Sequence, residues 1–177
     1  MSFPDEVNEV AARTVAGGVA LTAVVAAAAH QPWLALPLAY GFVARVASGP
    51  RFSPLAQLAT RVVAPRLGAH ARRSPGPPKR FAQGIGASFT LAASGLVLSG
   101  EPTAALVLLG LLAVPAIAEA AAGFCVGCRI FSLLMEIGLV PESTCEACAD
   151  LYGPAARARR DERARQAPDV RSLGRVR

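Results

Sequence analysis

Two stretches of this 177-residue sequence almost lack charged residues. Residues 14–47 contain one charge, Arg45, and residues 81–128 contain two, Glu101 and Glu119. Charged residues make up only 17% of the chain, whereas an ordinary soluble domain has about 25%. Uncharged blocks of this length argue against a soluble domain and are typical of a helical protein that crosses a membrane several times.

The sequence also lacks the signatures of several functional classes. It has a single lysine, few aromatic residues near its arginines and no nucleic-acid-binding motif, so its net charge of +6 does not indicate binding to nucleic acid. It has no Walker loop, no Ser-His-Asp pattern and no dinucleotide-binding fingerprint. Its first residues, Met1 to Glu6, are acidic rather than basic, so we expect the first apolar block to be retained as a span and not removed as a secretory signal.

Four apolar blocks predict membrane-spanning helices, at about residues 12–30, 32–47, 81–99 and 103–123. Short turns at residues 30–32 and 99–102 join these helices into two hairpins, and we expect the fourth helix to continue to residue 140. The predicted fold is therefore an all-α, four-helix integral membrane domain over residues 1–140. A short segment with a CxxC pair follows at 141–153, and a basic, disordered tail at 154–177.

The distribution of basic residues predicts the orientation. Neither short turn has a lysine or arginine, whereas the segment from Arg45 to Arg80 and the tail from Arg157 are rich in them. The positive-inside rule then places both termini and the middle loop in the cytoplasm, with the chain embedded in the inner-membrane lipids. The cytoplasm keeps thiols reduced, which disfavours permanent disulfides.

The segment between the hairpins has a pattern of its own. Apolar residues recur at helical spacing from Phe52 to Val62, which predicts an amphipathic helix at the membrane interface or, alternatively, one packed on the spans. Ser53 and Pro54 are expected to begin this helix and Pro65 to end it, while residues 74–78 are expected to form a stiff, non-helical loop. In the third span, small residues recur every four positions and predict a close helix contact; they are Ala82, Gly86, Thr90 and Ser94.

Four sequence stretches resemble a known family, the bacterial membrane proteins catalogued as domain of unknown function 4395. They are Asp5-Glu-Val-Asn8, Gly49-Pro-Arg-Phe-Ser-Pro-Leu55, Pro78-Lys-Arg-Phe-Ala-Gln-Gly-Ile-Gly86 and Glu119-Ala-Ala-Ala-Gly-Phe-Cys-Val-Gly-Cys128. The resemblance covers about residues 4–128 and implies a small bacterial inner-membrane protein without an established activity. It also implies thioredoxin-like or rhodanese-like partners, and through them an association with thiol or sulfur chemistry.

The four cysteines form two CxxC pairs, Cys125 with Cys128 and Cys145 with Cys148. Such pairs suit a thiol redox or sulfur-handling role, in which Cys145 is expected near a helix N-terminus that stabilises its thiolate. The same spacing also falls within the range of a four-cysteine zinc site, which makes zinc a candidate cofactor. Four cysteines can also hold an iron–sulfur cluster, but nothing in the sequence favours it over zinc. The third interpretation is that the cysteines are small buried hydrophobic residues. Enzymatic and non-enzymatic roles both stay open.

Two charged residues are predicted near the inner ends of spans. Arg45 ends the second block and Glu119 the fourth, and an ion pair between them would lower the cost of placing each charge in the membrane. The alternative is that both side chains reach the head groups. Glu119 is also a candidate proton acceptor for Cys125.

Overall fold

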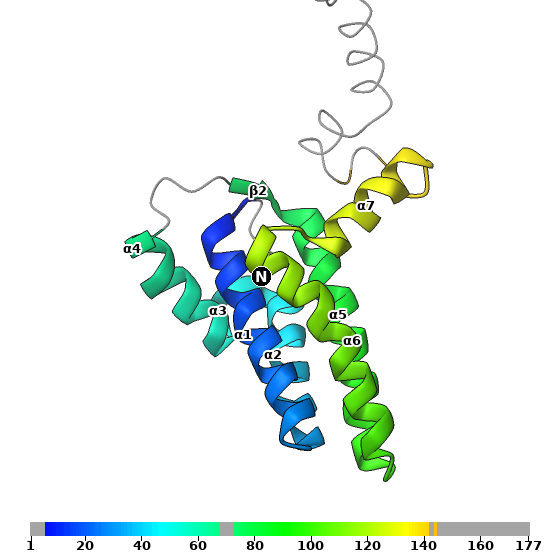
Figure 1. Cartoon of the computed structure of the whole chain (residues 1–177). Coiled ribbons are helices and arrows are strands. Elements are labelled where there is room, and N and C mark those ends of the chain that lie inside the picture. Colours follow the sequence, from blue (N-terminus) through cyan, green and yellow to red (C-terminus); the bar gives the residue numbers. More distant parts are fainter. Residues whose placement is uncertain (1–5, 68–72, 142–143, 145–177) are drawn as a thin grey trace, which may run out of the picture. The chain divides into compact units, whose positions relative to one another are not determined.

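The computed structural model describes residues 6–67, 73–141 and 144, which are mostly helical (Figure 1). The longer helices are α1 (Glu9–Ala28), α2 (Ala35–Ser48), α5 (Gly76–Leu98), α6 (Pro102–Ala122) and α7 (Val126–Glu136). The short helical segments are η1 (Pro32–Leu34), η2 (Gly49–Arg51), α3 (Pro54–Leu58), the π-helical turn η3 (Ala59–Val63) and α4 (Ala64–Leu67). The strands are β1 (Glu6–Asn8) and β2 (Arg73–Pro75). The chain divides into two compact units after Phe131, and the first holds the features below.

Local signals set the ends of α1 and α6. Asn8 caps α1, because its side-chain oxygen accepts hydrogen bonds from the backbone N–H groups of Val10 and Ala11 at 2.9 and 3.3 Å. Gly123 ends α6 in the left-handed conformation, with a φ of 68°, which glycine adopts without steric cost. Arg13 of α1 donates to the carbonyl of Ala120 near this end of α6, where a cation complements the helix dipole.

The four longest helices of the first unit pack in antiparallel pairs. Helix α1 lies mainly against α6, α2 against α5, and α5 also against α6 (Figure 1). The interior is built largely from alanine, and this lets the helix axes approach closely. One close contact is at Gly86 of α5, where a Cβ atom would stand 2.2 Å from the ring of Phe42 on α2. The predicted helix contact along the small-residue stripe is confirmed at this position.

Large apolar side chains point outward from these helices. Leu21 on α1, Leu91 on α5, and Val107, Leu111 and Val114 on α6 are all more than half exposed. An apolar surface around a small-residue interior is typical of helices that contact lipid. Three of the described helices, α1, α5 and α6, are long and apolar enough to cross a membrane. The membrane character of the chain is thus supported by these three helices.

Helix α2 is shorter than predicted for the second span. Its 14 residues extend about 21 Å at 1.5 Å per residue, against a hydrocarbon thickness of about 30 Å. The predicted arrangement of four spanning helices in two hairpins is therefore supported only in its coarser form, a helical protein with three candidate spans.

Three local predictions were wrong. The fourth helix does not continue to residue 140, because Gly123 ends α6 and a new helix begins at Val126. Pro65 does not end the middle helix, which runs on through the π-helical turn to Leu67. Residues 76–78 are helical, since prolines are tolerated in the first turn, where backbone N–H groups have no intrahelical partner.

A two-stranded ribbon was not predicted. Strands β1 and β2 pair antiparallel, with Val7 opposite Ser74, and Glu6 forms an exposed ion pair with Arg73 at 3.0 Å. The ribbon fixes the start of α1 beside the start of α5. The predicted CxxC segment at 141–153 and the basic tail at 154–177 lie almost entirely outside the described residues.

Candidate functional site

Cys125 occupies the N-terminal capping position of α7. Its carbonyl accepts the first hydrogen bond of the helix, from the backbone N–H of Arg129 at 3.1 Å. Its sulfur accepts a hydrogen bond from the backbone N–H of Cys128 at 3.3 Å, in the manner of a capping side chain. The positive end of the helix dipole therefore lies at the sulfur of Cys125, where it favours the thiolate.

Gly127 brings the CxxC pair onto α5. A Cβ atom at this position would stand 2.5 Å from the Cβ of Ala82 and 2.7 Å from its Cα. The first turn of α7 therefore contacts the α5 backbone so closely that only glycine fits. This contact fixes Cys125 and Cys128 relative to the residues that α5 carries.

A buried ion pair lies beside the two thiols. Lys79 of α5 bonds to Glu119 of α6, and their side chains are only 10% and 17% exposed. Lys79 interacts electrostatically with both Cys125 and Cys128, and so does Glu119. The ion pair thus brings one positive and one negative charge to the dithiol.

The surroundings shift the pKa values of the two thiols in opposite directions. The pKa of Cys125 is lowered, chiefly by a hydrogen bond from the Cys128 side chain and also by the charge of Lys79, against the opposing effects of burial and Glu119. The pKa of Cys128 is raised by its hydrogen bond to Cys125, by burial and by the charge of Cys125. Cys125 is therefore the better nucleophile and Cys128 the thiol that keeps its proton.

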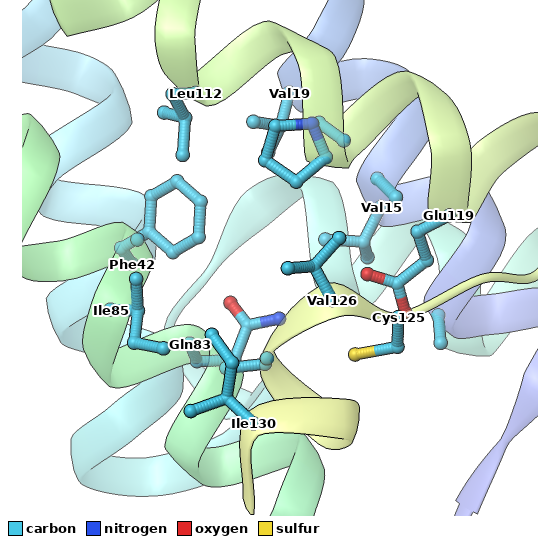
Figure 2. Close-up of a pocket in the computed structure, with 17 residues that line it drawn as sticks. Val15, Val19, Phe42, Gln83, Ile85, Leu112, Glu119, Cys125, Val126 and Ile130 are labelled. Atoms are coloured by element: carbon cyan, nitrogen blue, oxygen red, sulfur yellow. The ribbon is translucent and has the colours of Figure 1, made fainter.

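A cavity of about 110 Å³ opens next to Cys125. It lies between α1, α2, α5, α6 and the start of α7, and most of its lining is apolar. Figure 2 shows three polar side chains at this cavity, the Glu119 carboxylate, the Cys125 sulfur and the Gln83 amide. Pro115 also lines it; lacking a backbone N–H, this proline interrupts the hydrogen bonding of α6 there. A small, mainly apolar group could reach Cys125 through this space.

The predicted ion pair between Arg45 and Glu119 is not present in the structure. Glu119 pairs with Lys79 instead, whereas Arg45 donates to the side-chain oxygens of Gln83 at 2.7 Å and Ser53 at 3.0 Å. The guanidinium of Arg45 also lies 4.4 Å from the ring centroid of Phe42. The first turns of α5 give each of the two residues a different partner. Lys79 pairs with Glu119, and Gln83 accepts a hydrogen bond from Arg45.

Cys145 and Cys148 lie outside the described residues, so the structure brings together only one of the two predicted pairs. Cys125 and Cys128 are not joined by a disulfide. Within the described part of the chain, no group of three or more Cys, His, Asp or Glu side chains is placed to hold a metal ion. The predicted four-cysteine zinc site stays untested, because half of its ligands are not among these residues.

Sequence reasoning missed Lys79 and Gln83 as members of the site. Both residues stand in one of the stretches that resemble the family, but no role was predicted for either, although two features could have identified Lys79. It is the only lysine in the chain, and it lies near the N-terminus of a helix, where the dipole disfavours a cation. A nearby carboxylate offsets this unfavourable effect, and Glu119 provides one.

The comparisons with known proteins give one result. The family model described as "Domain of unknown function (DUF4395)" matches residues 7–136, which include Lys79, Glu119, Cys125 and Cys128. Neither the curated proteins nor the solved structures contain a match to this chain.

Proposed function

Since this chain belongs to the DUF4395 family, whose function is unknown, we propose from its site that it is a membrane-bound thiol redox or sulfur-handling protein. Cys125 is its attacking thiolate and Cys128 its resolving thiol. The observation that carries this proposal is the position of Cys125 at the N-terminus of α7, with its sulfur bonded to the N–H of Cys128 and close to the charge of Lys79.

The exchange reaction follows from these positions. The Cys125 thiolate attacks one sulfur of a partner's disulfide, forming a mixed disulfide and releasing one partner thiolate. Cys128 then loses its proton and attacks the Cys125 sulfur, which closes the Cys125–Cys128 disulfide and releases the second partner thiolate. The two cysteines lose two electrons, which reduce the partner. Of the two protons that the partner's thiolates take up, one balances the proton that Cys128 releases and the other comes from the solvent, because Cys125 reacts already deprotonated. Glu119 lies close enough to act on Cys128 electrostatically and is the acceptor of its proton.

The expected partner is a soluble thioredoxin-like or rhodanese-like protein. Cys125 lies just beyond the C-terminal end of α6, at the same end of the helices as Arg13 and Arg80. We assign this end to the cytoplasmic face of the inner membrane, because described basic residues outside the apolar spans, such as Arg51, Arg73 and Arg80, lie at this end. A soluble cytoplasmic protein could then reach the dithiol.

The ribbon supports a topology with four crossings. Val7 pairs with Ser74, so the start of α1 and the start of α5 lie on the same side of the membrane. If α1 crosses the membrane, the chain has to return before α5, and α2 is the long helix between them. We propose that α2 makes this return across a locally thinned region of the bilayer, with both termini cytoplasmic.

The alternative function is a non-enzymatic membrane protein with a structural four-cysteine zinc site. It is favoured by the spacing of Cys125, Cys128, Cys145 and Cys148. Cys125 and Cys128 already lie in one helical turn, which would supply two of the four thiolates a tetrahedral zinc requires.

Metal analysis and trapping of a mixed disulfide separate the two functions. Full-length protein purified without added metal is assayed for zinc and then exposed to oxidised thioredoxin. For the redox function we expect no zinc, and Cys128→Ser should accumulate a mixed disulfide that the matched Cys125→Ser does not form. For the zinc function we expect one zinc per chain and its loss in every single Cys→Ser variant. Four thiols that bind no zinc and exchange with no disulfide would contradict both functions.

A further inference from the structure

Arg45 is a buried cation without an anionic partner among the described residues. Only 5% of its surface is exposed, and its hydrogen bonds go to the neutral side chains of Gln83 and Ser53. Its Nη2 amino group is fully buried and has no acceptor in the part of the chain that the structure describes. A buried charge is costly unless an opposite charge compensates it, and more so within a membrane domain.

A second cavity, of about 80 Å³, lies against Arg45. It is well above the roughly 10–15 Å³ of the same measure that one water molecule needs. Its lining includes Arg45, Lys79 and Gln83, and no carboxylate of the described residues lines it. Because Glu119 already neutralises Lys79, the positive charge of Arg45 is the one charge of the lining that stays uncompensated among the described residues. Water in this cavity could accept a hydrogen bond but could not balance that charge.

We propose that this cavity binds one small oxyanion of the phosphate or sulfate type, with Arg45 as its main ligand. Arg45 lines the cavity and carries a positive charge that no carboxylate of the described residues compensates, and its Nη2 group has no acceptor among these residues. Lys79 also lines the cavity, but its charge is balanced by Glu119. A guanidinium suits such an anion, because its planar N–H groups match the spacing of oxyanion oxygens. The neutral partners, Gln83 and Ser53, hold the guanidinium in place without competing for its charge.

This oxyanion could be free in solution or could be the phosphate of an anionic phospholipid. Both would reach the cavity from the arginine-rich end of the helices, where an anionic membrane surface is expected. The inference is independent of the dithiol chemistry, because it rests on residues other than Cys125 and Cys128.

The test uses full-length protein in a non-ionic maltoside detergent, which carries no phosphate or sulfate group. Binding of radiolabelled phosphate is measured by equilibrium dialysis at constant ionic strength, and co-purified phospholipid is quantified by mass spectrometry. Arg45→Gln removes the charge and keeps hydrogen-bonding ability. Ala11→Val narrows the cavity without touching Arg45, since Ala11 lines it and is buried. Arg80→Gln is the matched control, because Arg80 is exposed and donates to the Val46 carbonyl rather than lining the cavity.

We expect one phosphate per chain, displaced by sulfate, with affinity reduced about tenfold or more in Arg45→Gln, reduced in Ala11→Val and unchanged in Arg80→Gln. If the anion is a headgroup, one phosphatidylglycerol per chain should co-purify with the wild type and not with Arg45→Gln, and phosphate should bind only after delipidation. The absence of both ligands from the wild type would overturn the proposal. An unchanged phosphate affinity in Ala11→Val would also overturn the proposal. This variant provides the test if Arg45→Gln fails to fold.

Discussion

Gly127 lies so close to Ala82 that a Cβ atom on the glycine would stand 2.5 Å from the Ala82 Cβ. The central glycine of the first CxxC pair is therefore a packing requirement as well as a spacer. It joins the first turn of α7, which carries Cys125 and Cys128, to the helix that carries Lys79. The geometry of the dithiol site depends on this contact.

Replacing Gly127 by alanine should therefore disturb the site. We expect Gly127→Ala to reduce the free energy of unfolding by about 1–3 kcal/mol, the usual cost of overpacking. It should also speed alkylation of Cys125, because the first turn of α7 has to move away from α5. Denaturant titration in detergent measures the first effect, and peptide mapping after brief iodoacetamide treatment measures the second.

Gly110 of α6 provides the control, because no atom lies within 4 Å of a Cβ built there. Gly110→Ala should leave the alkylation rate unchanged and leave stability unchanged or raised by about 0.5–1 kcal/mol. Equal effects of the two substitutions would show that the contact between Gly127 and Ala82 does not hold the site.

The reactivity of the two thiols should differ with pH. A thiolate reacts with iodoacetamide and a thiol does not, so a lowered pKa increases the rate at a given pH. Because the pKa of Cys125 is lowered and that of Cys128 raised, the Cys125 rate should reach its half-maximum below about pH 8.5, the value of a free cysteine. The rate at Cys128 should still be rising above that pH. Peptide mapping by mass spectrometry resolves the two positions.

Two substitutions should move the Cys125 profile to higher pH. Cys128→Ala removes the hydrogen bond that stabilises the thiolate, and Lys79→Met removes the neighbouring positive charge. Arg80→Gln is the control, since Arg80 is not among the groups that shift this pKa. A Cys125 profile that is the same in wild type and both variants would contradict the electrostatic description of the site.

The buried ion pair should couple α5 to α6 energetically. Lys79→Met and Glu119→Gln alone should each cost about 3–5 kcal/mol, because each leaves the opposite charge buried without a partner. The double variant should cost much less than the sum. The exposed pair of Glu6 with Arg73 is the control, for which the coupling energy should be about 0–1 kcal/mol.

A second double-mutant cycle, on Arg45 and Glu119, tests the ion pair that was predicted from the sequence. The structure gives those two residues different partners, so the coupling energy between them should be much smaller than that between Lys79 and Glu119. Strong coupling between Arg45 and Glu119, or none between Lys79 and Glu119, would show that the partners are assigned incorrectly.

The sequence predicted the features that depend on composition and local periodicity. The apolar blocks indicated the candidate spans α1, α5 and α6, and the small residues around Gly86 indicated a helix contact. It could not predict the partners of charged residues. Arg45 and Glu119 occupy similar positions at the ends of their helices, but which residue of α5 faces each depends on how the helices are rotated and spaced.

Local stop signals were also misjudged. Gly123 lies in one of the stretches that resemble the family, yet the apolar residues that follow it predicted that the helix would continue. The structure ends α6 there because a glycine can adopt a positive φ, after which Cys125 begins a new helix. The position of Cys125 as a capping residue therefore could not be derived from hydropathy. Conversely, Pro77 and Pro78 stand in the first turn of α5, where a proline does not remove an intrahelical hydrogen bond.

The position of the middle loop relative to the membrane is the sharpest test of the topology. With four crossings, reporters inserted in the 66–74 loop and fused after Arg177 should both lie in the cytoplasm, and one inserted at Glu101 should lie on the far side. With only α1, α5 and α6 crossing, the 66–74 loop would lie across the membrane from the N-terminus. The pairing of β1 with β2 is incompatible with that separation, because it holds Val7 beside Ser74. We therefore expect paired alkaline phosphatase and green fluorescent protein fusions to give the four-crossing pattern. A cytoplasmic reporter at Glu101 would contradict it.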